Sequence, residues 1–142
     1  MSYPRRMANI HYIELLPLRE GATQCEDGCD YICRLSLRGS LGMDNAQETA
    51  VLVQALIDGG IRKFILNMEN MNYVDSTGIG TIIRFKKSLQ PLGGDVVLLN
   101  VPPKVSEVLD LVNLKEYVRI FYAEPKALEY LRQAPAGQVP AS

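Results

Sequence analysis

Histidine and cysteine are scarce in this 142-residue chain, which has one histidine, His11, and three cysteines. A serine nucleophile needs a neighbouring base, and a single imidazole near the start of the chain disfavours such a pair. Metal sites commonly use CxxC pairs or several histidines, whereas Cys25, Cys29 and Cys33 are separated by three residues each. The sequence therefore predicts no metal site, no catalytic residues, and cysteines that serve in packing or lie at the surface.

The chain also lacks an excess of basic charge and a long apolar run. Its 15 basic and 16 acidic residues give a formal net charge of -1, which argues against an electrostatic nucleic-acid binder. No run approaches the roughly 18 apolar residues that span a bilayer. No apolar segment typical of a secretory signal follows Met1–Arg6. We therefore predict a cytoplasmic protein with no direct membrane insertion.

Motifs for nucleotide binding and for acyl transfer are missing. The chain has neither a GxxxxGK[ST] phosphate loop nor a GxSxG nucleophile turn. Gly78-Ile79-Gly80 is a lone GxG without the third glycine of a dinucleotide site. The acidic residues are dispersed along the sequence, and paired-carboxylate catalysis would need two of them in one cleft. The sequence predicts no cofactor and no enzyme.

Apolar segments instead predict alternating strands and helices. The expected strands are 10–18, 31–38, 61–66, 95–99 and 117–122. The expected helices run from about 45 to 58, 76 to 91, 102 to 112 and 125 to 132. The expected connections are 21–30, a turn bracketed by Gly39 and Gly42, and a polar loop over 67–75. This order predicts an α/β fold: a mainly parallel sheet of four to five strands, with an antiparallel N-terminal edge strand and about four helices.

The length and composition predict one domain with two flanking segments. Residues 1–24 form an N-terminal extension with a candidate edge strand, and residues 25–132 form the domain. Residues 133–142 are rich in Ala, Pro, Gly and Ser and are expected to be disordered. An unpaired edge strand invites pairing, so the extension either packs on the sheet or mediates a homodimer.

The run Asp75-Ser76-Thr77-Gly78 is the most informative segment of the chain, because it joins an apolar strand to an amphipathic helix. Serine and threonine are good helix N-caps, since their oxygens accept from unpaired N–H groups of the first turn. A phosphate at this position would also be stabilised by the helix dipole. The run is therefore either a plain cap or a phosphorylation switch.

Met68, Met71 and Tyr73 stand among polar residues just before this run. One interpretation is that the methionines fill gaps where the loop closes over the end of the sheet. The other is an adaptable contact surface beside Ser76, since partners gather at the carboxyl ends of parallel strands.

Several segments of the chain resemble the STAS domain family, and within it the bacterial anti-sigma factor antagonists. The matching segments are Leu35–Leu41, Phe64–Gly80, Gly93–Leu98 and Val105–Leu111. The resemblance covers roughly residues 30–132, and the Asp-Ser-x-Gly run after an apolar strand is its most specific part. It implies the fold expected above.

The resemblance also implies a function. A serine kinase that is itself the anti-sigma factor would phosphorylate Ser76, with Thr77 as the second-choice acceptor, and a phosphoserine phosphatase would reverse this. The unphosphorylated form would bind the anti-sigma factor and release a sigma factor. The residues implied in partner binding are Ser40, Gly42, Met71, Tyr73, Asp75, Ser76, Thr77 and Gly78.

One turn departs from the family pattern. The family commonly has Gly-Glu-Leu-Asp, whereas this chain has Gly39-Ser40-Leu41-Gly42 and so lacks both acids. The change is either neutral drift at an exposed turn or the sign of a different partner. The alternative function is a STAS subunit of a larger assembly. Such an assembly would be a stressosome-type signalling complex or a lipid-transporting ABC system, with Ser76 and Thr77 in a fixed subunit contact.

Overall fold

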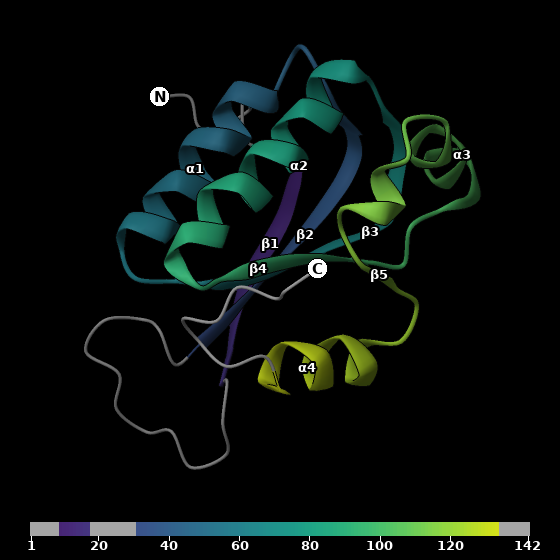
Figure 1. Ribbon diagram of the computed structural model, residues 1–142. Coiled ribbons are helices and arrows are strands. Elements are labelled where there is room, and N and C mark those ends of the chain that lie inside the picture. The colour runs from purple at the N-terminus through teal and green to yellow at the C-terminus, as the bar shows by residue number, and fades with distance from the viewer. Residues whose placement is uncertain (1–8, 18–30, 134–142) are drawn as a thin grey trace.

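The computed structural model describes residues 9–17 and 31–133, which form one five-stranded sheet in the order β1-β2-β3-β4-β5 (Figure 1). The strands are β1 (Ile10–Pro17), β2 (Tyr31–Leu41), β3 (Lys63–Val74), β4 (Asp95–Leu99) and β5 (Ile120–Phe121). β1 runs antiparallel to β2, and the other neighbouring strands are parallel. The predicted α/β fold with an antiparallel N-terminal edge strand is confirmed.

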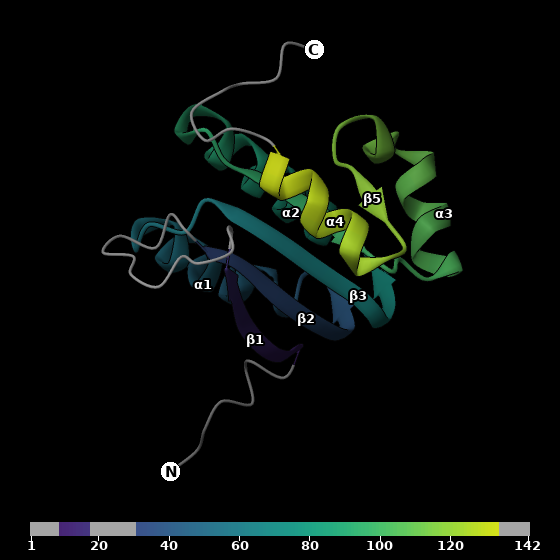
Figure 2. The same cartoon turned by 90° about the horizontal axis from the view of Figure 1, so that it is seen from below.

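Four α-helices cover the two faces of the sheet. They are α1 (Ala46–Asp58), α2 (Ser76–Leu89), α3 (Pro103–Leu111) and α4 (Glu124–Gln133). α1, α2 and α3 lie on one face, and α4 lies alone on the other (Figures 1 and 2). None of the helices in the described ranges is long and apolar enough to span a bilayer.

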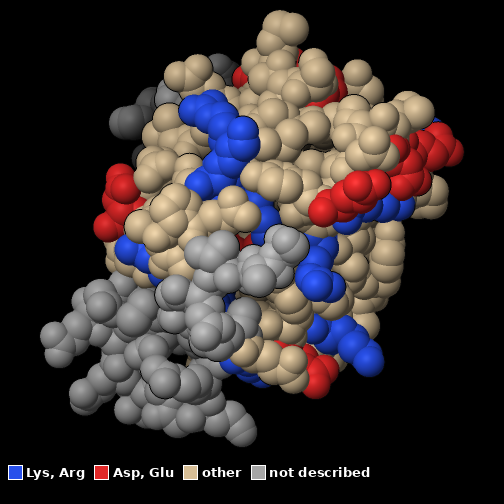
Figure 3. All heavy atoms as spheres, viewed as in Figure 1, with Lys and Arg blue, Asp and Glu red and all other residues tan. Residues whose placement is uncertain are grey.

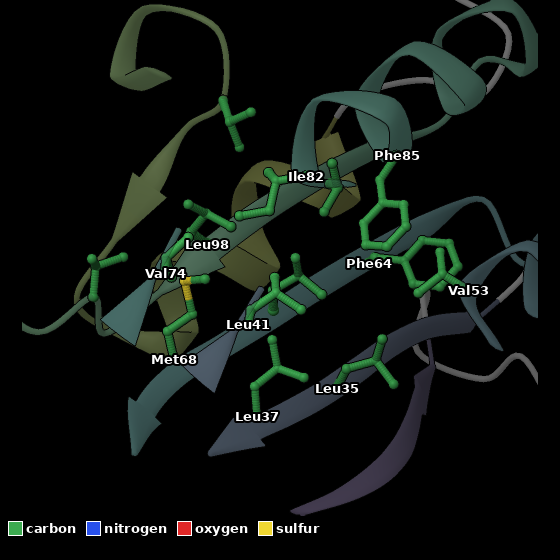
Figure 4. Packing of buried hydrophobic residues seen from close by; sticks show 14 of the residues in the cluster. Leu35, Leu37, Leu41, Val53, Phe64, Met68, Val74, Ile82, Phe85 and Leu98 are labelled. Atoms are coloured by element: carbon green, nitrogen blue, oxygen red, sulfur yellow. The ribbon is translucent and has the colours of Figure 1, made fainter. Parts of the chain in front are cut away.

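The hydrophobic core is split by the sheet into two clusters. The larger cluster joins β2, β3 and β4 to α1–α3 and contains Phe64 and Ile82, which Figure 4 shows. Leu66 belongs to it as well, and each of the three is at most 1% exposed. The smaller cluster lies under α4 and contains Ile65 and Val97. Phe64 and Leu66 point to one face and Ile65 to the other, as strand geometry requires. Residues 64–66 of β3 are all apolar because this part of the strand is buried on both faces of the sheet.

The prediction of a polar loop over 67–75 is wrong, because β3 continues to Val74. The pairing of β3 with β4 ends at Asn67, but its pairing with β2 extends to Leu41 and Val74. Met68, Met71 and Val74 are buried, at a spacing of three rather than two. Register shifts between β2 and β3 cause this spacing, so the alternation that marks a strand is absent from the sequence.

The predicted turn at Gly39–Gly42 is also wrong for its first three residues, which belong to β2. Gly39 has a φ of 75°, and the register with β3 shifts between Gly39 and Ser40. A bulge of this kind uses the left-handed conformation that glycine adopts without strain. The glycine therefore bends the strand without ending it.

Smaller differences occur at the other element ends. The strand predicted over 117–122 is only Ile120–Phe121 (β5) in the structure. A 3₁₀ turn, Leu114–Glu116, precedes it. The predictions for the 21–30 connection, for Cys25 and Cys29, and for the tail after 133 lie outside the described residues. Cys33 is fully buried in β2, and burial raises the pKa of its thiol to about 12, which fits a role in packing.

Candidate functional site

The candidate site lies at the sheet edge where β2 and β3 both end. Ser40 pairs with Tyr73 and Leu41 with Val74, so the two strands finish side by side. The chain then enters α1 after β2 and α2 after β3. Because parallel strands end at a common edge, residues more than 30 positions apart in the sequence meet here.

Asp75 is the residue that organises this edge. One carboxylate oxygen accepts from the backbone N–H of Gly78 at 3.0 Å, and the other accepts from that of Met43 at 3.1 Å. Its own N–H donates to the carbonyl of Leu41 at 3.2 Å. The hydrogen bonds from Gly78 and then Met43 lower the pKa of Asp75, because they favour the charged carboxylate. A single side chain thus caps α2 and fastens the loop after β2.

The run does cap α2, but through Asp75, so the prediction that the hydroxyl of Ser76 or Thr77 is the cap is wrong. Ser76 is the first residue of the helix, and its side chain is exposed, as is that of Thr77. The helix cap does not depend on the Ser76 hydroxyl, so that hydroxyl can change chemically without removing the cap. The first-turn N–H groups and the helix dipole favour negative charge nearby.

The two glycines predicted to contact a partner have structural roles. Gly78 is buried, and a Cβ there would overlap the carbonyl oxygen of Leu41. Gly42 is also buried, and a Cβ there would overlap the carboxylate of Asp75. Gly78 lets α2 approach the end of β2 closely, and Gly42 lets the loop after β2 approach the side chain of Asp75. The missing acid at Gly42 therefore has a packing explanation within this chain.

Of the two residues predicted in the segment before Asp75, only Tyr73 is accessible. Its side chain is 56% exposed, whereas that of Met71 is 4% exposed and packs in the larger core cluster. Met71 therefore fills space, as the first interpretation of the methionines proposed. The surface gains instead Met43, which is 79% exposed and which the sequence analysis missed. Met43 lies between Gly42 and Asp44 in a loop, and no strand or helix periodicity in the sequence predicts that its side chain is exposed.

A shallow cleft of about 280 Å³ joins these residues. It is lined by Ser40, Gly42, Met43, Asp44, Tyr73 and Asp75. Two exposed apolar side chains, Met43 and Tyr73, flank polar groups, an arrangement typical of protein interfaces. Ser40 is exposed at the cleft, whereas the carboxylate of Asp75 is occupied by backbone N–H groups.

The metal ligands and the surface charges of the described residues are the next features that bear on the site. Within residues 9–17 and 31–133, no group of three or more His, Cys, Asp or Glu side chains could hold a metal ion. On the face shown in Figure 3, acidic and basic side chains lie beside one another at several places, among uncharged areas. The site is best described as an exposed hydroxyl beside a fixed carboxylate, within a partly apolar contact surface.

Comparisons with known proteins identify the family of the chain. The sequence model of the STAS domain matches residues 22–127. BtrV of Bordetella bronchiseptica, named as a proposed anti-sigma factor antagonist, is 27% identical over 85 residues, which are 60% of this chain and 73% of BtrV. The crystal structure of TM1081 from Thermotoga maritima, another proposed anti-sigma factor antagonist, superposes with a TM-score of 0.71. TM1081 is 25% identical, with 87% of this chain and 97% of that chain covered.

A further similar structure is that of the Bacillus anti-sigma factor antagonist SpoIIAA, which has been solved in two forms. The unphosphorylated form gives a TM-score of 0.65 at 20% identity, covering 85% of this chain and 96% of SpoIIAA. The phosphorylated form gives a TM-score of 0.57 at 18% identity, covering 84% and 98%.

The fold and the site together define an α/β domain that presents an exposed serine at the start of a helix. The chain belongs to the STAS domain family. β1 precedes the matched residues, yet it pairs with β2 from Ile10 to Pro17.

Proposed function

We propose that this protein is an anti-sigma factor antagonist that is switched by phosphorylation of Ser76. In the unphosphorylated state it binds an anti-sigma factor, which is also a serine kinase, and a sigma factor is released. The names of BtrV and TM1081 support this class. The observation that carries the proposal is the exposed Ser76 hydroxyl at the start of a helix whose cap is supplied by Asp75. We propose further that the protein is cytoplasmic and acts by binding, without catalysis of its own.

Phosphorylation changes the charge of this edge without requiring a new fold. The phosphoryl group replaces the hydroxyl proton of Ser76 and adds about -1.5 to -2 charges at pH 7. The N-terminus of α2 tolerates that charge within the protein, and the cap made by Asp75 stays in place. A partner packed on Met43 and Tyr73 would have to bury the phosphate, at a high desolvation cost. A loss of about 3 kcal/mol would weaken binding by more than a hundredfold.

Ser40 and Gly42 do not favour the alternative of a fixed assembly subunit. A Cβ at position 42 would overlap the Asp75 carboxylate as it lies in this structure, and Ser40 remains exposed beside the cleft. We propose that these positions adapt the same surface to a partner with a different charge pattern. A phosphoserine phosphatase would complete the cycle by restoring the Ser76 hydroxyl.

Intact mass spectrometry of the protein from its native cells, with fragmentation to place any phosphate, tests the modification. We expect a single phosphate on Ser76 that is lost in Ser76→Ala and kept in Thr77→Ala. A Ser76→Ala protein that still carries one phosphate would contradict the assignment.

A further inference from the structure

A second cleft, of about 510 Å³, lies far from Ser76 on the molecule. α2 contributes Lys86 to its lining, residues 115–119 form another wall, and α4 contributes Tyr130. Lys86 lies almost three helical turns after Ser76, or about 15 Å along the axis of α2. Clefts of about 300–1,000 Å³ accommodate small organic molecules. This cleft is therefore large enough for a ligand that does not touch the Ser76 site.

Asp95, the first residue of β4, holds two of the lining side chains in place. Its carboxylate accepts from the ammonium of Lys86 and from the hydroxyl of Tyr130, both at 2.6 Å, and from the N–H of Val96 at 2.8 Å. The buried ammonium of Lys63 also interacts electrostatically with Asp95. The negative charge of Asp95 is thus offset from within the protein, and Lys86 and Tyr130 are fixed before any ligand arrives.

Arg119 is the cation that is best placed to bind an anion in this cleft. Its Cζ lies 4.9 Å from the centroid of the Tyr130 ring, so a cation–π contact orients the guanidinium. The side chain is exposed, and no Asp or Glu of the described residues forms an ion pair with it. A guanidinium has five N–H donors in a fixed fork that matches the oxygens of a phosphate. Arg119 therefore combines a fixed orientation with unused donors.

The charge of the lining matches a phosphate group. The charged side chains that line the cleft are Lys86, Lys115, Glu116 and Arg119, which sum to two positive charges. Lys115 also lies 2.9 Å from a carboxylate oxygen of Asp110, but that carboxylate is 60% exposed, and exposed pairs of this kind are weak. A phosphate monoester carries about -1.5 to -2 charges at pH 7. Tyr117 and Tyr130 add aromatic surface to the same cleft, against which an organic group can pack.

We propose that this cleft binds a small organic phosphate. Arg119, Lys115 and Lys86 hold the phosphate group, and the organic group packs against Tyr117 and Tyr130. Such a ligand gives the protein an input at the far end of the helix that begins at Ser76. The inference does not depend on the phosphorylation of Ser76 or on the identity of the protein partner.

The test uses the full chain and phenyl phosphate as the probe, with binding followed by ¹H–¹⁵N NMR titration. We expect saturable shifts for the amides of Lys86 and residues 115–119. Phenyl phosphate should bind more tightly than inorganic phosphate, because only its ring can pack against the tyrosines. Arg119→Gln should weaken binding by at least about tenfold, since charge-assisted hydrogen bonds to phosphate are strong. Arg84→Gln removes the same charge from an exposed position of α2 outside this cleft, and this matched control should leave the dissociation constant unchanged.

A second variant should act in the opposite direction. Glu116→Gln removes the carboxylate from the lining and should tighten binding by about threefold, which a loss of folding cannot imitate. The absence of saturable shifts would overturn the proposal. Equal weakening by Arg119→Gln and Arg84→Gln would also overturn it, because binding would then follow net charge alone. Equal affinity for phenyl phosphate and inorganic phosphate would overturn the assignment of an organic phosphate. Ser76→Ala should bind the probe as the unchanged protein does, so failure of this proposal is distinguishable from failure of the proposed switch.

Discussion

Two glycines in the first turns of α2 should respond oppositely to the same substitution. A Cβ at Gly78 would overlap the carbonyl oxygen of Leu41 and lie 2.9 Å from its carbonyl carbon and 3.1 Å from its Cγ. The obstacle is largely backbone, so it cannot rotate away. A Cβ at Gly80 would meet nothing within 4 Å. Both glycines lie in α2 and neither has a positive φ, so Gly80→Ala is the control for Gly78→Ala.

The magnitudes follow from this difference in space. Alanine in a helix interior is about 0.5–1 kcal/mol more favourable than glycine, so Gly80→Ala should stabilise the protein by about that amount. This corresponds to a rise in Tm of roughly 3–5 °C per kcal/mol for a domain of this size. Gly78→Ala has the same intrinsic gain but must push α2 away from β2. Overpacking of this kind costs about 1–3 kcal/mol, so the net effect should be destabilising.

Urea denaturation followed by circular dichroism measures the free energy of unfolding of both variants. The displacement of α2 in Gly78→Ala also moves Ser76. The amide chemical shifts of Gly42 and Thr77, which lie beside it, should therefore change, and those of α4 should not. A Gly78→Ala protein as stable as Gly80→Ala would refute the close packing of α2 against Leu41. The account of this glycine as a spacer for the site would then fail.

Three other predictions address the loop, the core thiol and the edge strand. Gly42→Asp should lose about 1–3 kcal/mol in urea denaturation because its side chain meets the Asp75 carboxylate, whereas Ser40→Glu, at an exposed position, should change stability by less than about 0.5 kcal/mol. Equal losses would contradict the packing explanation for Gly42. Burial raises the pKa of Cys33 to about 12, above the ordinary value of 9.0, so the folded state keeps the thiol protonated and stability should fall as pH rises above 9. In a Cys25→Ser/Cys29→Ser background, Cys33→Ala should reduce the fall that begins near pH 9, whereas burial, which raises the pKa of Tyr130 above its ordinary 10.0, leaves a fall at higher pH in both proteins. A fall of the same size in both proteins would exclude Cys33 as a cause. Ile13 is 43% exposed on the edge strand β1, so Ile13→Lys should halve the mass measured by light scattering if the protein is a homodimer. A dimeric Ile13→Lys protein would place the contact elsewhere.

The sequence predicted the order of strands and helices along the chain because their signals are local. Asp95–Leu99 is a buried apolar run with the expected bounds, and α1 and α4 agree with the predicted helices to within about a residue at each end. The second half of β3 was missed because bulges against β2 change the spacing of buried residues. A bulge is a property of the strand pair, so one strand's sequence does not reveal it.

The position of Ser76 was predictable, but its role in the helix was not. Asp75, Ser76 and Thr77 are all acceptable caps, and the choice depends on which carboxylate or hydroxyl meets the N–H of Gly78. Asp75 is favoured because it also accepts from Met43, 32 residues earlier in the chain. For the same reason the sequence indicated neither the exposure of Met43 nor the burial of Gly42 and Gly78. These features arise only when the ends of β2 and β3 meet.

The central claim is that phosphorylation of Ser76 releases the anti-sigma factor. The most direct measurement is the dissociation constant of the complex with the cognate anti-sigma factor, using serine, phosphoserine or asparagine at position 76. Asparagine is the neutral control for a change of side chain. We expect serine and asparagine to bind with similar affinity, and phosphoserine to bind at least about a hundredfold more weakly. Equal affinity of the serine and phosphoserine proteins would contradict the proposed function.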